Sequence, residues 1–469
     1  MNRLPLILIM LFLFTIVKSQ EKIINYTKDN GLTSNYIQRY KVRSNGEVWL
    51  GANNGINIFN GDQWTQKRKI KHPKSGKEKS IVSVSYILED KNSMIWIGCG
   101  NGVITYDEGN WNLLEKAWKG SPPTRFFMKD SKGNFWVCLQ EYKSSSSSVT
   151  SGLTKGQVFM FDGNKWINFT NTAGGVRYQQ MTESKSFFTS LVEDKNGHIW
   201  IGNYNGAFKY DGSKWEVIRK KNKKIPDNEV TFIKKDKEEN IWIGTDNGLA
   251  RLVEDEWIIY DQGDGFPGRS VYFLWQDSKK NYWAFSRSRT PYNIYKGLCL
   301  FTDGKWVHQT DPNLVTYINS IADFGNGIVW ASGKDGVSVF DGNQWKLFSM
   351  ADSIQEGYYK GLFKDYKNNI WAYSKNSVIK YDSVQWSFYT KETSEGDEWK
   401  IRFLKEDSKG NIWVGTNDIG VFKFDRTEWT HYNESSGLID DKVKFLFEDK
   451  EGNVWIIAKK GVTVFNYGK

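Results

Sequence analysis

A tryptophan recurs along this chain at a nearly constant interval, and this repeat constrains the fold more than any other feature. Ten such anchor tryptophans are present: Trp49, Trp96, Trp136, Trp200, Trp242, Trp283, Trp330, Trp371, Trp413 and Trp455. Their mean spacing is about 45 residues, and a second Trp follows each of the first nine. A repeat of this length from end to end indicates an array of similar units rather than several unlike domains.

Each repeat is predicted to form four short antiparallel strands. In the ninth repeat the strands are expected over 400–406, 411–416, 421–425 and 428–432. Asp, Asn and Gly separate them, which are residues that favour turns, and no 3.6-residue periodicity is present. Four strands in 40–50 residues are typical of a β-propeller blade. The paired tryptophans would fill the wedge between neighbouring blades.

The two ends of the chain predict how the ring closes. The segment 26–32 resembles 432–438, which follows a fourth strand, whereas the last repeat has only three strands and ends at Phe465. The N-terminal strand is therefore expected to complete the tenth blade and remove the open sheet edges. The predicted fold is an all-β, ten-bladed ring over 21–469. Two smaller rings are the alternative, but no linker or second unpaired strand stands midway.

Residues 1–20 have the features of a secretory signal peptide. Arg3 precedes an apolar run over 4–17, and Lys18, Ser19 and Gln20 follow. The run is shorter than the roughly 20 residues of a membrane-spanning helix. We expect cleavage near Ser19/Gln20 and a mature chain, without a transmembrane segment, in the periplasm or outside the cell; retention as an N-terminal anchor is the alternative.

Residues typical of catalysis are sparse, so no enzyme activity, cofactor or metal is predicted. The three cysteines, Cys99, Cys138 and Cys299, lie in apolar runs and are expected to be buried, and the four histidines show no metal-ligand spacing. An Asp stands six residues before the anchor Trp in eight repeats. So many equivalent carboxylates are expected to cap turns rather than to catalyse.

One position on the first strand of each repeat points to a ligand. From the second repeat onward, the side chains five residues before the turn Asp are mostly polar and stand between apolar neighbours: Ser85, Arg125, Thr189, Thr231, Tyr272, Ile318, Lys360, Arg402 and Lys444. Four are cationic and none is acidic, which predicts a positive channel mouth for an anionic ligand such as an acidic oligosaccharide. Tyr358, Tyr359 and Trp399 stand just before these strands and are candidates for stacking on sugar rings. The alternative is a water-filled channel with solvated side chains.

Two kinds of segment interrupt the repeats. Insertions at 141–155, with the serines 144–148, and at 286–295 are expected to be surface loops, or a lid over a ligand. Basic stretches occur at 67–79 and 219–224, and the chain carries a formal net charge of +10. Nucleic acid is not an expected partner of an exported chain, so these stretches are interpreted as solvated loops.

The repeat resembles the two-component regulator propeller repeat. The resemblance lies in segments such as Gly31-Leu32-Thr33-Ser34-Asn35, Ile241 to Leu249 and Asp407 to Gly420, and it extends over 21–469. It implies a recognition module like the periplasmic sensor regions of hybrid two-component systems in Bacteroidetes, which often read glycan fragments. Rings of that family usually have seven blades in tandem pairs, whereas this chain has ten repeats and no kinase or receiver region.

These observations favour an exported module that recognises a glycan or a protein partner and, by the resemblance, serves as the sensory component of a signalling system. A propeller glycoside hydrolase or lyase is one alternative, and a scaffold in a cell-surface complex is another. The candidate ligand-binding residues are Arg125, Tyr272, Tyr358, Tyr359, Lys360, Trp399, Arg402 and Lys444.

Overall fold

A computed structural model describes ten parts of the chain. They are residues 22–90, 92–100, 102–115, 124–142, 153–169, 187–287, 295–334, 336–348, 358–390 and 399–466. The inserted residues 143–152 and 288–294 lie outside these parts, as does the expected signal peptide.

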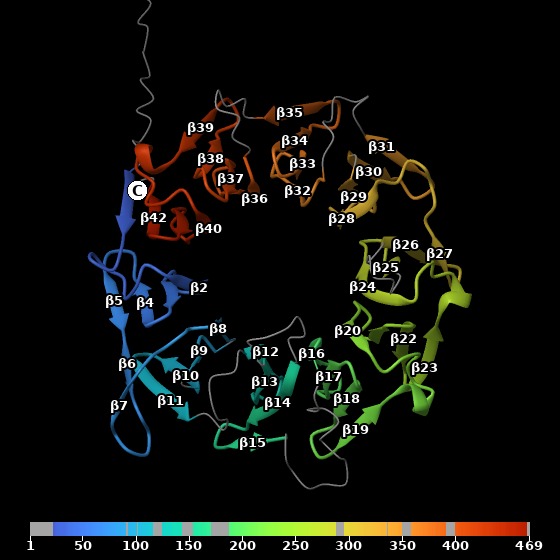
Figure 1. Ribbon diagram of the computed structural model, residues 1–469, viewed down its shortest axis with the longest axis horizontal. Coiled ribbons are helices and arrows are strands. Elements are labelled where there is room, and N and C mark those ends of the chain that lie inside the picture. Colours follow the sequence, from blue (N-terminus) through green and yellow to red (C-terminus); the bar gives the residue numbers. More distant parts are fainter. Residues whose placement is uncertain are drawn as a thin grey trace, which may run out of the picture.

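The described residues form ten four-stranded antiparallel sheets arranged as a ring (Figure 1). We number these blades 1 to 10 in chain order. The first strand of each blade faces the ring axis: β2 (Ile37–Val42), β8 (Tyr86–Glu89), β12 (Thr124–Lys129), β16 (Ser190–Glu193), β20 (Val230–Lys235), β24 (Ser270–Gln276), β28 (Thr316–Asp323), β32 (Leu362–Lys364), β36 (Ile401–Glu406) and β40 (Val443–Glu448). The ten-bladed ring confirms the predicted fold.

The remaining strands follow outward in order. The second strands are β3 (Val48–Ala52), β9 (Ile95–Cys99), β13 (Phe135–Tyr142), β17 (Ile199–Asn203), β21 (Ile241–Thr245), β25 (Tyr282–Arg287), β29 (Val329–Lys334), β33 (Ile370–Tyr373), β37 (Ile412–Thr416) and β41 (Val454–Ala458). The third strands are β4 (Gly55–Phe59), β10 (Gly102–Asp107), β14 (Leu153–Phe161), β18 (Gly206–Tyr210), β22 (Gly248–Val253), β26 (Tyr295–Thr302), β30 (Gly336–Phe340), β34 (Ser377–Tyr381), β38 (Val421–Phe424) and β42 (Gly461–Asn466). The outer strands are β5 (Trp64–Lys67), β11 (Asn110–Glu115), β15 (Trp166–Asn168), β19 (Trp215–Ile218), β23 (Glu256–Tyr260), β27 (Lys305–His308), β31 (Trp345–Phe348), β35 (Trp386–Thr390), β39 (Trp429–Tyr432) and β1 (Lys22–Tyr26).

The N-terminal strand closes the ring as predicted. β1 pairs antiparallel with β42 over its whole length, from Lys22 opposite Asn466 to Tyr26 opposite Val462. The first and last parts of the described chain therefore share blade 10. This pairing gives β42 a hydrogen-bonded neighbour and places β1 as the outer strand.

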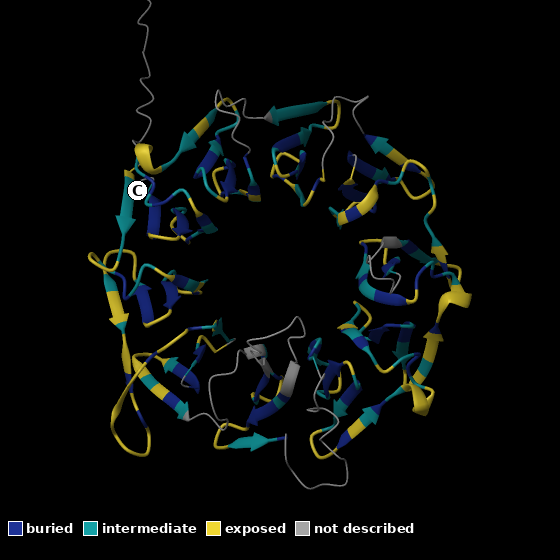
Figure 2. Cartoon of the chain, viewed as in Figure 1, coloured by how far each residue is buried: buried dark blue, intermediate teal, exposed yellow. Residues whose placement is uncertain are grey.

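The second strand is the most buried part of a blade (Figure 2). Its sequence pattern of Trp, an aliphatic residue and Gly follows from packing. In blade 9, Trp413 and Val414 are fully buried, and a Cβ on Gly415 would lie 2.0 Å from the Phe403 ring of the inner strand. Only glycine leaves room for that ring.

The anchor tryptophans pack against the next blade as well as within their own. Seven anchor rings lie with their centroids 5.6–6.5 Å from the outer-strand Trp of the following blade, including Trp455 and Trp64 across the closure. This confirms that the tryptophan pair fills the wedge between blades.

The turn Asp caps the turn and also binds the anchor tryptophan. Asp407 accepts hydrogen bonds from the Asn411 backbone N–H and amide, and also from Trp413 Nε1 at 2.8 Å. All eight Asp residues that stand six before the anchor make the same bond to the indole, at 2.7–3.0 Å. In blade 1, which lacks this Asp, Glu47 accepts from Trp49 at 3.0 Å. The recurring carboxylate therefore fixes the ring that fills the wedge.

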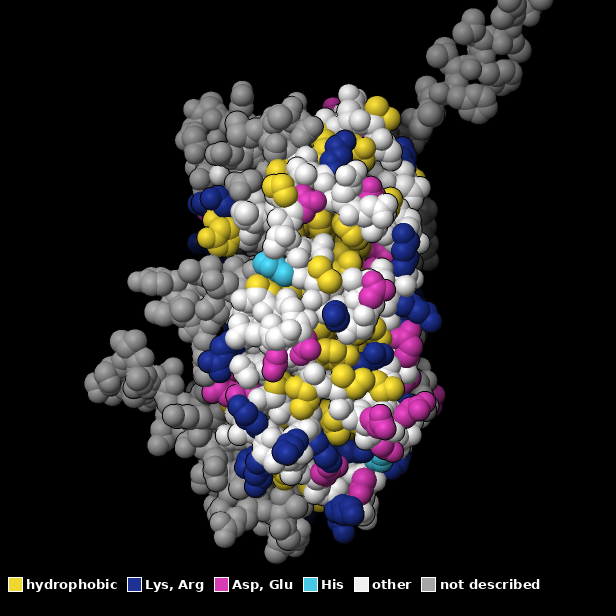
Figure 3. Space-filling model, turned by 90° about the vertical axis from the view of Figure 1, so that its right-hand side faces the viewer, with side chains coloured by type: hydrophobic (Ala, Val, Ile, Leu, Met, Phe, Trp, Pro, Cys, Tyr) yellow, Lys and Arg dark blue, Asp and Glu magenta, His cyan; other side chains and the backbone are white. Residues whose placement is uncertain are grey.

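Other features lie outside the regular blades. A two-stranded hairpin, β6 (Lys69–Lys71) and β7 (Glu78–Ser80), follows blade 1, and short 3₁₀ turns occur at Lys220–Asn222, Gln262–Asp264 and Glu434–Ser436. On the outer rim, Ile258, Ile259 and Val307 of β23 and β27 are exposed. Hydrophobic side chains gather among charged ones on that side of the ring (Figure 3). The three cysteines are buried and form no disulfide, as expected.

Candidate functional site

The candidate mouth position is created by a backbone irregularity at the start of the inner strands. In blade 9, Ile401 pairs with Thr416 and Phe403 with Gly415, so Arg402 is an extra residue in the inner strand. The same bulge occurs at this position in blades 1, 3, 5, 6 and 10. A β-bulge redirects the side chain of the inserted residue. We call the residue 11 before each anchor Trp the mouth residue.

The structure corrects this position in blade 7. Counting from the turn Asp selected Ile318, but Ile318 is only 4% exposed and packs in the core. The turn of blade 7 is one residue longer, with Asp323 seven before Trp330 instead of six. Ser320 pairs with Ser332, so Asn319 is the mouth residue.

Four mouth residues bond to the next blade. Asn319 Nδ2 donates to the Tyr359 carbonyl at 3.1 Å, and Lys444 Nζ donates to the Ile37 carbonyl at 2.8 Å. Arg402 Nη1 donates to the Val443 carbonyl at 3.4 Å, and the Thr231 hydroxyl donates to the Val271 carbonyl. Each acceptor is the residue just before the mouth residue of the following blade. These polar side chains therefore link inner strands around the axis, a role that the sequence pattern did not reveal.

Cationic mouth residues gather on one arc of the ring. Lys360, Arg402 and Lys444 belong to the consecutive blades 8, 9 and 10, and the exposed Arg39 of blade 1 follows. Partial burial lowers the pKa of Lys444 below its usual value, and the positive charges of Arg39 and Arg402 lower it further. The arc therefore concentrates positive charge where an anion would reduce the repulsion.

Tyrosine rings border this arc. At the position 13 before the anchor, Tyr36, Tyr317 and Tyr358 are 51%, 48% and 50% exposed. Lys444 Nζ lies 4.6 Å from the Tyr36 ring centroid, and the Tyr317 and Tyr358 rings meet edge to face at 6.3 Å. Tyr358 was among the candidates from the sequence. Tyr36 and Tyr317 were missed, although their spacing from the anchor Trp could have identified them.

Two candidate rings do not face the mouth. Tyr359 is 0% exposed, because it occupies the position of a core residue that is aliphatic in most other blades. Trp399 is 4% exposed and stacks on Phe422 at 4.9 Å. Both rings are covered by the protein, so stacking of a sugar on Tyr359 or Trp399 does not fit the structure.

The other two candidates lie away from the cationic arc. The Tyr272 ring in blade 6 is partly buried, and the Arg287 guanidinium lies over it at 5.1 Å. Arg125 lies in β12 of blade 3, and its side chain is outside the described part of the structure. The structure therefore groups Lys360, Arg402, Lys444 and Tyr358, and separates Tyr272 from them.

A cavity of about 350 Å³ opens between blades 6 and 7 beside the exposed tyrosines. Two of the residues that line it belong to β26, and the others run from the end of β27 to the start of β28. They include His308, Gln309, Asp311, Thr316 and Tyr317. Through Tyr317 the cavity adjoins Tyr358 and hence the arc. Its amide, carboxylate and hydroxyl groups suit the hydroxyls of a sugar.

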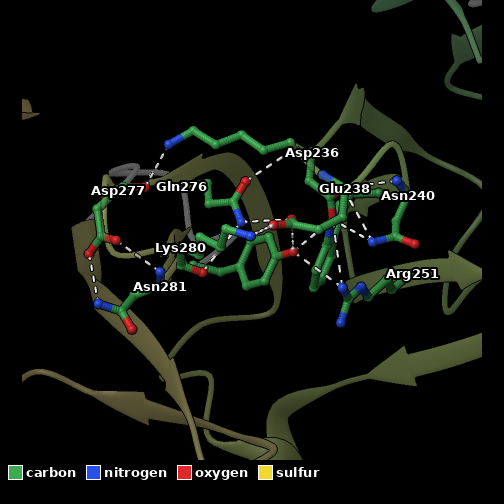
Figure 4. Close-up of polar contacts among 11 residues, drawn as sticks. Asp236, Glu238, Asn240, Arg251, Gln276, Asp277, Lys280 and Asn281 are labelled. Atoms are coloured by element: carbon green, nitrogen blue, oxygen red, sulfur yellow. Dashed lines mark hydrogen bonds and ion pairs between the residues drawn. The ribbon is translucent and has the colours of Figure 1, made fainter. Parts of the chain in front are cut away.

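A second cavity, of about 330 Å³, lies between blades 5 and 6 beside the Asp turns. The Tyr282 hydroxyl in its wall lies 2.7 Å from Asp236 Oδ2 and 3.1 Å from Glu238 Oε2 (Figure 4). Arg251 Nη2 donates to the same hydroxyl at 3.2 Å. Desolvation and the bond to Asp236 raise the pKa of Tyr282. These contacts cross the interface between blades 5 and 6, so the network links the two blades.

The described residues contain no group of three or more His, Cys, Asp or Glu side chains arranged to hold a metal ion. Within the same parts of the chain, no helix has the length and hydrophobicity needed to span a membrane.

Comparison with known proteins identifies the repeat. The family described as two component regulator propeller matches residues 182–205, 224–247 and 396–418. These matches cover the entry into blades 4, 5 and 9 and their first two strands. No curated protein matches the chain.

Several solved structures are similar. The extracellular domain of the hybrid two component system BT4673 from B. thetaiotaomicron is 17% identical over 94% of this chain and 66% of its own, with a TM-score of 0.34. The extracellular domain of the hybrid two component system BT3049 from the same organism is 18% identical over 93% of this chain and 64% of its own, with a TM-score of 0.28. PorZ, a surface component of the type-IX secretion system of Porphyromonas gingivalis, is 16% identical over 90% of this chain and 56% of its own, with a TM-score of 0.36. The chain spans 66% or less of the length of each of these structures. Three repeats of this chain therefore match the two component regulator propeller family, and the Asp–Trp pattern of the matched segments recurs in most of the other blades.

Proposed function

We propose that the chain is an exported recognition module whose mouth binds an anionic oligosaccharide on the arc from blade 7 to blade 1. The observation that carries this proposal is the succession of Lys360, Arg402, Lys444 and Arg39 on four consecutive blades, bordered by exposed tyrosines. Ammonium and guanidinium groups attract carboxylate or sulfate groups. A tyrosine ring offers an apolar face to the C–H face of a sugar and a hydroxyl at its edge.

The cavity between blades 6 and 7 supports an extended ligand. None of the residues that line it is a Lys or Arg, whereas the arc beside it is cationic. A chain with an uncharged unit in the cavity and acidic units along the arc would match both surfaces. Tyr317 and Tyr358 lie between the two.

The test is binding of oligogalacturonate, with a neutral oligosaccharide of the same length as reference. Arg402→Glu combined with Lys360→Glu should weaken binding by about tenfold or more, because two attractive charges become repulsive. Lys409→Glu combined with Lys367→Glu, in the Asp turns of the same two blades, is the matched control and should bind like the parent. Equal affinity of the mouth variant and the parent, with unchanged melting temperatures, would refute an anionic ligand at this site.

We further propose that this recognition serves a signalling system, with the chain exported by residues 1–20. The support is the family description of the matched repeats and the leader-like sequence. Deleting the gene should abolish the transcriptional response to the bound oligosaccharide. An unaltered response would favour the scaffold alternative, and cleavage of the oligosaccharide by the purified chain would favour the enzyme alternative. Mass spectrometry of the exported chain tests cleavage near Ser19/Gln20.

A further inference from the structure

The β6–β7 hairpin is an addition to the ring. It leaves the outer strand of blade 1, forms its own two-stranded sheet and returns to blade 2. Figure 1 shows it projecting outward from the rim, and Figure 2 shows that its tip is exposed. Among the described connections between blades, this one alone contains a separate sheet.

The hairpin is anchored at its base and ordered by its own hydrogen bonds. Ile70 is 2% exposed and packs in the core shared by blades 1 and 2. The Ile81 N–H donates to the Arg68 carbonyl at 2.8 Å, and the His72 N–H donates to the Lys77 carbonyl at 2.9 Å. The projection therefore presents its side chains from a fixed backbone.

Positive charge is concentrated on this hairpin. Residues 67–80 contain seven Lys or Arg and one acidic residue, Glu78, in a chain whose formal net charge is +10. Lys69 and Glu78 form an ion pair at 3.2 Å with side chains 60% and 57% exposed. The seven cations of this short hairpin repel one another, and an acidic partner would reduce that repulsion.

The cations are spread over both faces and the tip. Lys71 lies opposite Glu78, so these two side chains share one face, while Lys79 lies opposite Ile70 on the other. Lys74 and Lys77 are exposed at the tip. A flat surface would contact only one of these sets at a time, whereas a flexible chain can reach all of them.

We propose that the hairpin is a docking surface for an acidic segment of a partner protein. The segment 67–80 contains no Phe, Tyr or Trp. It therefore lacks the aromatic platforms on which nucleic-acid bases stack and the apolar anchors that insert into a membrane. Lysine ammonium groups interact as point charges and suit the irregular carboxylates of an acidic peptide.

The probe for this proposal is poly-L-glutamate. The parent chain is expected to bind it at 50 mM salt and to release it as salt screens the charges. Lys71→Gln, Lys77→Gln and Lys79→Gln together should reduce the affinity by about tenfold. The matched control carries Lys220→Gln, Lys221→Gln and Lys223→Gln in the other basic stretch, and its affinity should change by less than about twofold.

Three results would overturn the proposal. Unchanged affinity of the hairpin variant would show that the hairpin does not bind the acidic peptide. An equal loss in the control variant would show that only net charge matters. Tighter, hairpin-dependent binding of single-stranded oligothymidylate, or of phosphatidylglycerol–phosphatidylcholine vesicles, would replace the acidic peptide by a nucleic acid or a membrane. Melting temperatures of both variants, measured in parallel, exclude unfolding as the cause.

Discussion

Lys444 Nζ donates a hydrogen bond to the Ile37 carbonyl oxygen at 2.8 Å, which joins two residues 407 positions apart in the chain. Lys444 belongs to the last blade and Ile37 to the first, so this bond crosses the closure of the ring on its inner side. The pairing of β1 with β42 closes the same blade on its outer side. The side chain is thus part of the fold as well as part of the candidate binding arc.

Lys444→Met should lower the free energy of unfolding by about 1 kcal/mol, because the Ile37 carbonyl loses its charged donor while the aliphatic stem is kept. Chemical denaturation measures this. Lys442→Met changes an exposed lysine two residues earlier and serves as the control. Equal stability of the two variants would show that the bond across the closure contributes nothing.

Arg402→Gln should raise the pKa of Lys444 toward its usual value. Burial lowers that pKa, and so do the charges of Arg39 and Arg402, of which the substitution removes one. NMR titration of ¹³C-methylated lysines measures the shift. Lys409→Gln, on a turn of the same blade as Arg402, should leave the pKa of Lys444 unaltered. If the pKa of Lys444 does not change in Arg402→Gln, the two side chains are too far apart to interact.

Deleting residues 21–32 should expose the edge of β42 and cause aggregation or loss of cooperative unfolding. The deletion removes β1, which supplies the outer strand of blade 10. Thermal melting and light scattering report the effect. Lys22→Ala, which retains the strand, should melt like the parent. Normal melting of the deletion variant would contradict closure by the N-terminal strand.

Asp407→Asn should destabilise the fold by about 1–3 kcal/mol, because an amide has only one acceptor oxygen. In Asp407 one carboxylate oxygen accepts from the Asn411 backbone N–H, and the other accepts from the Trp413 indole and the Asn411 amide. The indole would keep its place only at the cost of an unpaired buried donor. Asp62→Asn, the same change at an exposed turn in blade 1, should have little effect. Urea denaturation distinguishes these outcomes, and equal midpoints would remove the structural role of the recurring carboxylate.

Stability should fall steeply in acid. Burial alone would raise the pKa values of Asp90, Asp194 and Asp236, but hydrogen bonds outweigh it and hold these pKa values below the usual one. A carboxyl whose pKa is lower in the folded state contributes stability above its unfolded pKa, near 4, and loses it as pH falls through the folded value. The urea midpoint should therefore be level between pH 7 and 5 and decline below about pH 4. A midpoint that stays level to pH 2 would contradict this.

Much of the fold was predictable because every blade repeats the same local pattern of strands and turns. The spacing of Trp413 from Asp407 marks one turn and one buried strand, and ten copies of this pattern predict ten blades. The similarity of 26–32 to 432–438 predicted the closure as well. Repetition supplied the redundancy that a single short strand lacks.

The candidate site was less predictable, because small offsets decide where a side chain points. The cationic character of Lys360, Arg402 and Lys444 was visible from the turn Asp, but the longer turn before Trp330 shifted the count and selected the buried Ile318 instead of Asn319. Neighbouring residues alternate in environment, so Tyr358 is exposed while Tyr359 is in the core. A shift of one residue along a strand moves a side chain from the exposed face to the buried face.

By itself the sequence determined the blade, its number and its closure, since these depend on local patterns that recur along the chain. Only the tertiary structure decided which side chains meet. It brought Arg39 beside Lys444, joined Asn319 to Tyr359, and buried Trp399 against Phe422. The physical reason is that bulges, turn lengths and blade-to-blade packing set side-chain directions, and these act between segments that are distant in the sequence.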